Sequence, residues 1–157
     1  MKKKIFGILL VLALCLIIAI PTFSSPHAQP SPNEIQVHLN GAPIAFDQPP
    51  IIENDRVLVP LRAIFEEMGA VVAWNQQTST ATATYDWGRV NISITIDSNI
   101  LIRNGVEIPL DVPARIVGGR TLVPVRAIAE SFGAEVSWVN ATRTVTIIHS
   151  SAVSGDP

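Results

Sequence analysis

Hydrophobic and polar residues alternate on both sides of two Asn-Gly pairs, Asn40-Gly41 and Asn104-Gly105. Alternation with a period of two is typical of a β-strand that buries one face. An Asn-Gly pair accepts the positive φ angles of a tight turn, so each pair with its flanking segments predicts a β-hairpin.

Further along the chain, each hairpin is followed by a short predicted strand and then by a segment with helical periodicity. Apolar residues recur at helical spacing after Pro60 and again after Pro124. Proline suits the first turn of a helix, where its missing N–H is not needed. Gly69 and Gly133 then suit left-handed C-caps. The pattern predicts two short helices, each between one proline and one glycine.

After each glycine the period returns to two. Trp74 and Trp138 lie on alternating segments that lead, through a polar turn, into threonine-rich strands at 80–85 and 144–148. A further alternating strand is predicted at 89–96, between the two halves of the chain. Each half therefore predicts a hairpin, a short strand, a helix and two strands.

These two halves are copies of one sequence unit. Their matching residues share a single offset of 64 positions, without a gap. Residues of very different chemistry keep that offset, which indicates an internal duplication. Five residues of the repeat motif, Arg56, Pro60, Arg62, Gly69 and Trp74, recur as Arg120, Pro124, Arg126, Gly133 and Trp138.

The predicted fold class is α+β, with repeats at about 34–85 and 98–149. Neither repeat is long enough to bury a comfortable core alone, and each helix needs a sheet over its apolar stripe. We therefore expect one pseudo-symmetric unit in which curved antiparallel sheets pack around both helices. Two separate subdomains are the alternative.

The N-terminus has the layout of a secretory signal peptide. Lys2–Lys4 precede an unbroken apolar run at 5–20, which ends at Pro21. Residues 1–24 are interpreted as this signal, with an uncleaved membrane anchor as the alternative. Residues 25–33 are rich in proline and serine and predict a flexible tether, and a disordered tail is expected at 150–157. The expected location is outside the cell, either secreted or associated with the envelope.

Composition excludes several functions. The net charge is −2 and all lysines lie at Lys2–Lys4, so the rest of the chain is more acidic and does not suit nucleic acid. Cys15 is the only cysteine and lies in the apolar run, which leaves no thiol chemistry for the body of the protein. Carboxylates occur singly except for Glu66-Glu67, and no serine-hydrolase motif or phosphate loop occurs. We expect no catalytic residues, no cofactor and no metal.

Two arginines of the motif open the predicted helices, where a cation opposes the helix dipole. One explanation for Arg62 and Arg126 is contact with an anion or a carbohydrate. The favoured explanation is a salt bridge, either to Glu66 and Glu130 four residues on or to Asp47 and Asp111 across the fold.

The aromatic residues also leave alternatives open. Trp74 and Trp138 could stack on sugars, but their alternation with valines favours a place in the core. Trp87 lies in a predicted turn and has no counterpart in the second repeat. It is the best candidate for an exposed contact, together with Tyr85.

The doubled string R-x-L-V-P-[LV]-R-A-I-x(4)-G-A-x-V-x-W, after N-G-x-x-I, resembles the copper amine oxidase N-terminal-like, or stalk, domain family. The resemblance covers Glu34 to His149. It implies an antiparallel sheet wrapped around a helix, and a non-catalytic accessory module of exported bacterial proteins. Amine oxidase chemistry itself is not expected. Tyr85 lacks the preceding asparagine of the quinone motif, and the three histidines include no His-x-His pair.

The sequence thus predicts a non-catalytic, exported module of the cell envelope with a structural or a binding role, whose partner is a wall polymer or an envelope protein. A self-associating stalk is the alternative, and a wall-remodelling hydrolase is less favoured.

Overall fold

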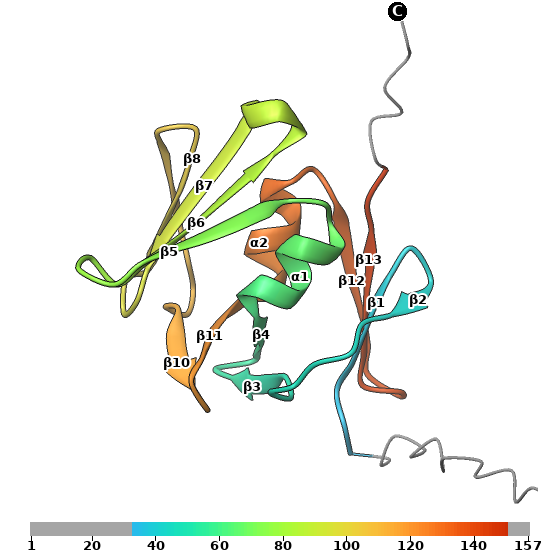
Figure 1. Cartoon of the computed structure of the whole chain (residues 1–157). Coiled ribbons are helices and arrows are strands. Elements are labelled where there is room, and N and C mark those ends of the chain that lie inside the picture. The colour runs from blue at the N-terminus through green and yellow to red at the C-terminus, as the bar shows by residue number, and fades with distance from the viewer. Residues whose placement is uncertain (1–32, 151–157) are drawn as a thin grey trace, which may run out of the picture.

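The computed structural model describes residues 33–150, which form short strands and two short α-helices (Figure 1). The predicted signal peptide, nearly all of the tether and nearly all of the tail lie outside the described residues. In chain order the elements are β1 (Gln36–Leu39), β2 (Ala42–Pro43), β3 (Ile51–Glu53), β4 (Arg56–Pro60), α1 (Leu61–Glu67), β5 (Val71–Asn75), β6 (Thr80–Tyr85), η1 (Asp86–Gly88), β7 (Val90–Thr95), β8 (Ile100–Arg103), β9 (Val106–Pro109), β10 (Arg115–Val117), β11 (Arg120–Pro124), α2 (Val125–Ser131), β12 (Glu135–Val139) and β13 (Thr144–Ile148).

The strands that lead into the two helices pair with each other at the centre of the fold. β4 and β11 are antiparallel, with Val59 opposite Val123. These valines are separated by the repeat offset of 64, so the pairing places an approximate twofold axis between them. The central sheet has the order β10-β11-β4-β3, and its outer strands β3 and β10 are also repeat equivalents.

Both helices begin and end as the sequence predicts, with a shift of one position at the start. Pro60 and Pro124 are the last residues of their strands and serve as N-caps rather than as first-turn residues. At the other end, Gly69 and Gly133 both have φ of +82°. Each glycine N–H donates to the carbonyl three residues back, and the next N–H donates to the carbonyl five residues back. This pattern is a Schellman motif, so the predicted glycine caps are confirmed.

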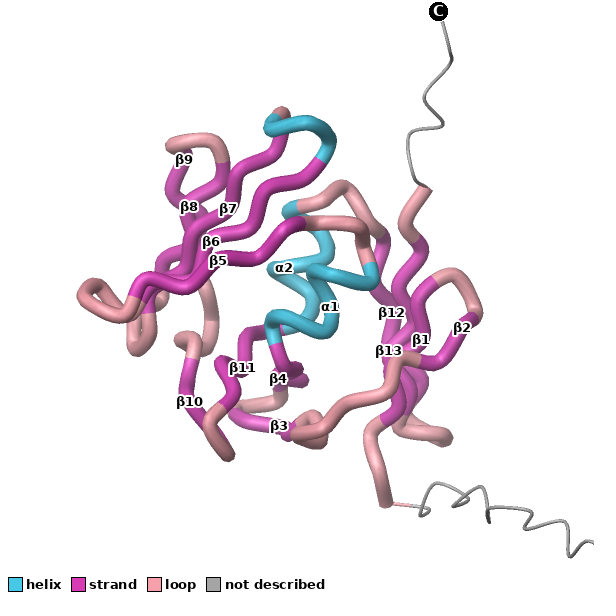
Figure 2. The backbone as a smooth tube through the Cα atoms, in the orientation of Figure 1, coloured by secondary structure: helices cyan, strands magenta, loops and turns pink. Residues whose placement is uncertain are grey.

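Each outer sheet combines strands from both repeats. One has the order β5-β6-β7-β8-β9, and the other has the order β12-β13-β1-β2. The opening hairpin of each repeat therefore joins the sheet that contains the closing strands of the other repeat. In the second sheet β1 and β13 pair in parallel, whereas every other strand pairing is antiparallel among the described residues. The helices lie between the two outer sheets, with the central sheet at one end (Figure 2).

The Asn-Gly turns also attach these hairpins to the neighbouring strand. Asn40 donates its side-chain N–H to the carbonyl of His149 and accepts the N–H of His149, both at 2.9 Å. Asn104 accepts the N–H of Asn91 at 2.7 Å and donates to the carbonyl of Arg89 at 3.0 Å. The asparagine of each turn therefore binds backbone as well as accepting positive φ.

One main core is shared by both repeats. It includes buried side chains from α1, α2 and the inner faces of both outer sheets. Phe65 of α1 and Phe132, just after α2, are in edge-to-face contact with ring centroids 4.9 Å apart. The α+β class is confirmed. The two-subdomain alternative does not describe this structure, because the hairpins are exchanged and the core is common.

The repeats differ most at β7, which lies between β6 and β8, whereas β13 and β1 pair directly. The turn η1 leads into β7. Neither helix in the described part of the chain has the length and apolar character needed to cross a membrane.

Candidate ligand-binding clefts

Two clefts, related by the approximate twofold axis, lie between the central sheet and the outer sheets. Cleft 1 is lined by the closing strand and helix of the first repeat and by β10–β11 of the second. Cleft 2 has the reverse arrangement. The main lining residues of cleft 1 are Asp47, Leu61, Arg62, Trp74, Ile116 and Arg120. Their repeat equivalents line cleft 2: Asp111, Val125, Arg126, Trp138, Ile52 and Arg56.

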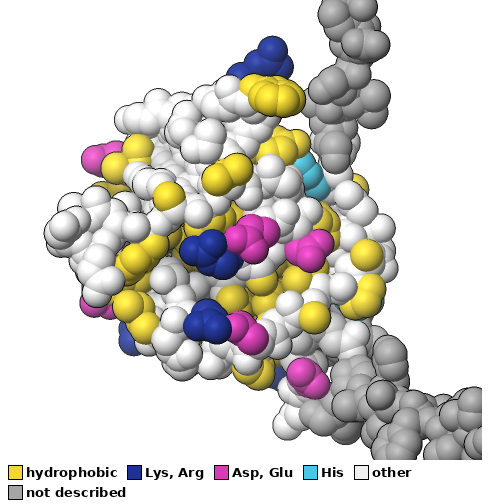
Figure 3. Space-filling view, viewed as in Figure 1, with side chains coloured by type: hydrophobic (Ala, Val, Ile, Leu, Met, Phe, Trp, Pro, Cys, Tyr) yellow, Lys and Arg dark blue, Asp and Glu magenta, His cyan; other side chains and the backbone are white. Residues whose placement is uncertain are grey.

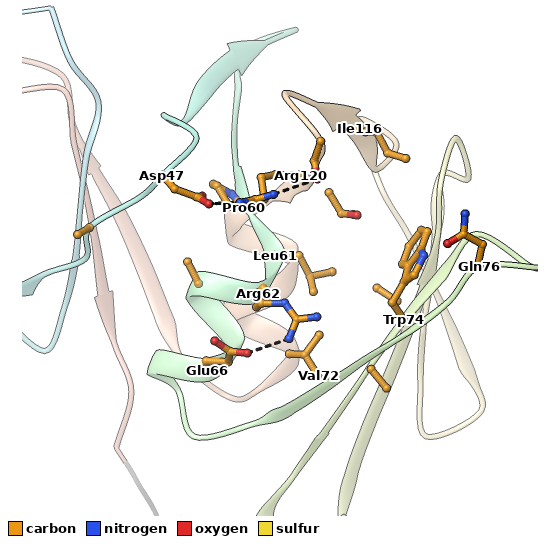
Figure 4. Close-up of a pocket in the computed structure, with 16 residues that line it drawn as sticks. Asp47, Pro60, Leu61, Arg62, Glu66, Val72, Trp74, Gln76, Ile116 and Arg120 are labelled. Carbon is orange, nitrogen blue, oxygen red and sulfur yellow. Dashed lines mark hydrogen bonds and ion pairs between the residues drawn. The ribbon is translucent and has the colours of Figure 1, made fainter.

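The chain forms each cleft because β5 and β12 are edge strands of their sheets. Trp74 lies opposite Ala81 of β6, on the inward side of the sheet, where Ala81 itself is buried. No further strand continues the sheet beyond β5 among the described residues, so the outer side of the indole is open. The close-up shows Trp74 rising from β5 toward Ile116, with Leu61 on the helix side (Figure 4).

This arrangement corrects the prediction for Trp74, whose ring was expected in the core. Trp74 is 39% exposed and lines cleft 1. The alternation along the strand correctly places Trp74 on the inward side of the sheet. Because β5 is the edge strand, no neighbouring strand covers the outer side of the indole. Trp138 is half-buried and packs against the core, so the core prediction fits it better.

The motif arginines pair as the favoured alternative predicted. Arg62 binds Glu66 at 3.0 Å and Arg126 binds Glu130 at 3.4 Å, both four residues apart on one helix. Both pairs are exposed, so each contributes little stability, about 0.3–0.5 kcal/mol.

The aspartates that were considered as partners of these arginines bind other arginines. Arg120 donates from Nε to Asp47 at 2.7 Å, and Arg56 donates from Nε to Asp111 at 2.7 Å. Each of these pairs joins one repeat to the other. The sequence contained a signal for them, because Asp47/Asp111 and Arg56/Arg120 keep the repeat offset with opposite charges.

The Asp47–Arg120 pair changes the ionisation of both groups. The hydrogen bond from Arg120 is the largest cause that lowers the pKa of the Asp47 carboxyl below its usual 3.8. The same bond raises the pKa of the Arg120 guanidinium. The pairing thus favours the charged form of both side chains at the rim of cleft 1.

Charged and apolar surfaces meet at this cleft. Basic side chains lie beside acidic ones on the face shown in Figure 3, with apolar surface between and around them. The dashed contacts in Figure 4 include the Arg62–Glu66 and Asp47–Arg120 pairs, on the helix side and the central-sheet side of the cavity.

Tyr85 and Trp87 were both predicted as exposed contacts, and the structure separates them. Tyr85 is half-buried, with its ring in edge-to-face contact with Phe132 and with His149. Tyr85 and His149 are repeat equivalents that meet across the approximate twofold axis, so Tyr85 has a packing role and its prediction is wrong. Trp87 is 96% exposed at the η1 turn, with φ of +53°. A contact through Trp87 stays a prediction.

The described residues contain no group of three or more His, Cys, Asp or Glu side chains placed to hold a metal ion. The groups that line cleft 1 can stack on a ring and donate or accept hydrogen bonds. These are the properties of a binding surface.

The fold and the clefts together describe a twofold module built from a duplicated unit. The chain belongs to the copper amine oxidase N-terminal domain family, whose family model matches residues 38–147. This family is a non-catalytic accessory domain, which agrees with the resemblance found in the repeat motif. No curated protein matches the chain.

Proposed function

We propose that this protein is an exported, non-catalytic module of the cell envelope that binds a cell-wall polymer. The observation that carries the proposal is the pair of equivalent clefts, each with an indole beside an apolar floor and ion-paired side chains at the rim. Binding sites of this size usually combine apolar walls with a few placed polar groups. The family supports the non-catalytic part, and the signal-like N-terminus supports export.

Co-sedimentation with purified peptidoglycan sacculi tests this function. The polypeptide to use begins at residue 30, because the strand pairings and the shared core of the described structure lie within 33–150. We expect sacculi to retain it, and we expect the double variant Trp74→Ala/Trp138→Ala to remain in the supernatant. Ile148→Ala is the control, since it removes an exposed apolar side chain outside both clefts. If sacculi retain no more wild-type protein than serum albumin, the proposal is wrong.

Self-association is a second candidate function, favoured by the edges of the five-stranded sheet. Its edge strands β5 and β9 carry exposed valines, Val71 and Val106. Exposed apolar edge strands can pair with another chain. Light scattering at increasing concentration tests this function: a dimer mass that Val71→Lys returns to monomer supports it, and a constant monomer mass excludes a stable stalk assembly.

A further inference from the structure

We infer that cleft 1 binds the pyranose rings of a neutral glycan, with one sugar ring stacked on Trp74, and that cleft 2 is a narrowed copy of this site that does not bind it. The inference rests on the proposed function and narrows it to one polymer chemistry and one of the two clefts.

The stacking surface is the first part of the case. The indole of Trp74 is partly exposed, and the cleft that it lines also includes three alanines, Ala45, Ala63 and Ala73. The floor contains Leu61 and Ala81, which are buried. A flat aromatic face above an open, shallow trough suits the C–H face of a sugar ring, which is apolar and flat.

The polar groups of cleft 1 are the second part. Arg62, Glu66, Asp47 and Arg120 are all about half exposed, so their outer hydrogen-bonding atoms are available to a ligand. Guanidinium and carboxylate groups offer paired donors or paired acceptors at fixed spacing, which suits neighbouring hydroxyls. Two cations and two anions also balance, so the rim offers no net charge to an ionic ligand. This balance favours a neutral sugar.

The difference between the clefts is the third part. Cleft 1 has a volume of about 830 Å³ and cleft 2 has about 580 Å³. Beneath the indole, Ala81 of cleft 1 is replaced by Val145 in cleft 2. Two added methyl groups raise the floor at the place where a stacked ring would lie.

An arginine also crosses cleft 2. Arg126 donates to the carbonyl of Val136 at 2.9 Å, which joins α2 to the edge strand β12. Within residues 33–150, no equivalent bond joins Arg62 to Val72. Arg143 further narrows cleft 2, whereas the first repeat has Ser79 at that position. Cleft 1 is therefore the wider copy.

Calorimetric titration with the hexasaccharide of β-1,4-linked N-acetylglucosamine tests the inference. This probe is neutral and made of pyranose rings alone. We expect one site per chain. Trp74→Ala should weaken binding at least tenfold, and Trp74→Phe should weaken it less because it keeps an aromatic face. The repeat-equivalent variant Trp138→Ala is the matched control and should change the affinity less than twofold.

A second variant tests cleft 1 while keeping Trp74 in place. Ala81→Val gives cleft 1 the floor of cleft 2, and the second repeat already accommodates valine there. We expect it to weaken the hexasaccharide at least fivefold with an unchanged thermal midpoint. Equal losses in Trp74→Ala and Trp138→Ala would overturn the assignment to cleft 1, and so would full affinity in Ala81→Val.

The failure of this inference can be told from the failure of the proposed function. Sacculi that retain the protein without any hexasaccharide binding would mean that another wall component, such as the stem peptides, is the ligand. In that case the glycan assignment is wrong and wall binding remains. Sacculi that retain nothing would contradict wall binding itself.

Discussion

The shared core makes a specific prediction about unfolding. Ile64 and Ile128 are repeat equivalents, one in each helix, and both side chains are fully buried in the same core cluster. If the two repeats fold as one unit, alanine at either position should destabilise the whole protein by a similar amount. If they were separate subdomains, each variant would weaken only its own half.

The magnitude follows from the burial. Isoleucine to alanine removes three carbons, worth about 2.4 kcal/mol at about 0.8 kcal/mol per buried methylene. The cavity left behind brings the expected loss to between about 2 and 5 kcal/mol. A domain of ordinary stability has about 5–15 kcal/mol, so both variants should remain folded without denaturant. Glu67→Ala, on the exposed side of α1, is the control and should change stability by about 0.5 kcal/mol or less.

Urea unfolding followed by fluorine NMR of 5-fluorotryptophan gives the required resolution. The chain has three tryptophans. Trp74 reports on β5 in the first repeat, and Trp138 reports on β12 in the second. We expect both native signals to disappear at the same urea concentration in each variant, with an unchanged m-value. Loss of the Trp138 signal in Ile128→Ala while the Trp74 signal persists would refute the reasoning.

Three further predictions concern the turns and one ion pair. Gly133→Ala should lower the free energy of unfolding by about 1–2 kcal/mol. The added methyl group meets no neighbouring atom, so the loss comes from the positive φ of +82° alone; a thermal midpoint equal to wild type would contradict this explanation. Asn40→Ala should lower the free energy of unfolding by about 1–3 kcal/mol and speed amide exchange at His149, because the Asn40 side chain binds the His149 backbone. Unchanged exchange would contradict a stabilising role for these two hydrogen bonds. The lowered pKa of Asp47 stabilises the fold above the usual carboxyl pKa, and this contribution is lost as pH falls through the lowered value. Asp47→Asn should therefore flatten the acid limb of the thermal-midpoint profile between pH 2 and 5, and an unchanged limb would contradict the pairing with Arg120.

Much of the local structure could be predicted because its causes are local. Asn40 and Gly41 specify a tight turn by themselves, and Gly69 ends α1 because a left-handed residue is needed there. The pairing of Arg62 with Glu66 also follows from spacing along one helix. Each of these features depends on a few neighbouring residues.

The features that were missed depend on contacts between distant segments. Alternation places Trp74 on the inward side of β5, but it does not show that β5 is an edge strand. The partner of Asp47 is Arg120, 73 residues away, and only the twofold arrangement brings them together. The packing of Tyr85 was missed because its ring contacts His149 only across the approximate twofold axis.

The duplication explains why a second cleft exists at all. Each repeat needs the hairpin of the other to complete its outer sheet, so one copy cannot form the fold alone. The twofold arrangement then produces two clefts whether or not two sites are useful. The two clefts differ at few positions: Val145 is a larger floor residue than Ala81, and the Arg126–Val136 bond crosses cleft 2. The two clefts thus share the tryptophan and the ion-paired side chains, and the positions at which the repeats differ make cleft 2 the narrower one.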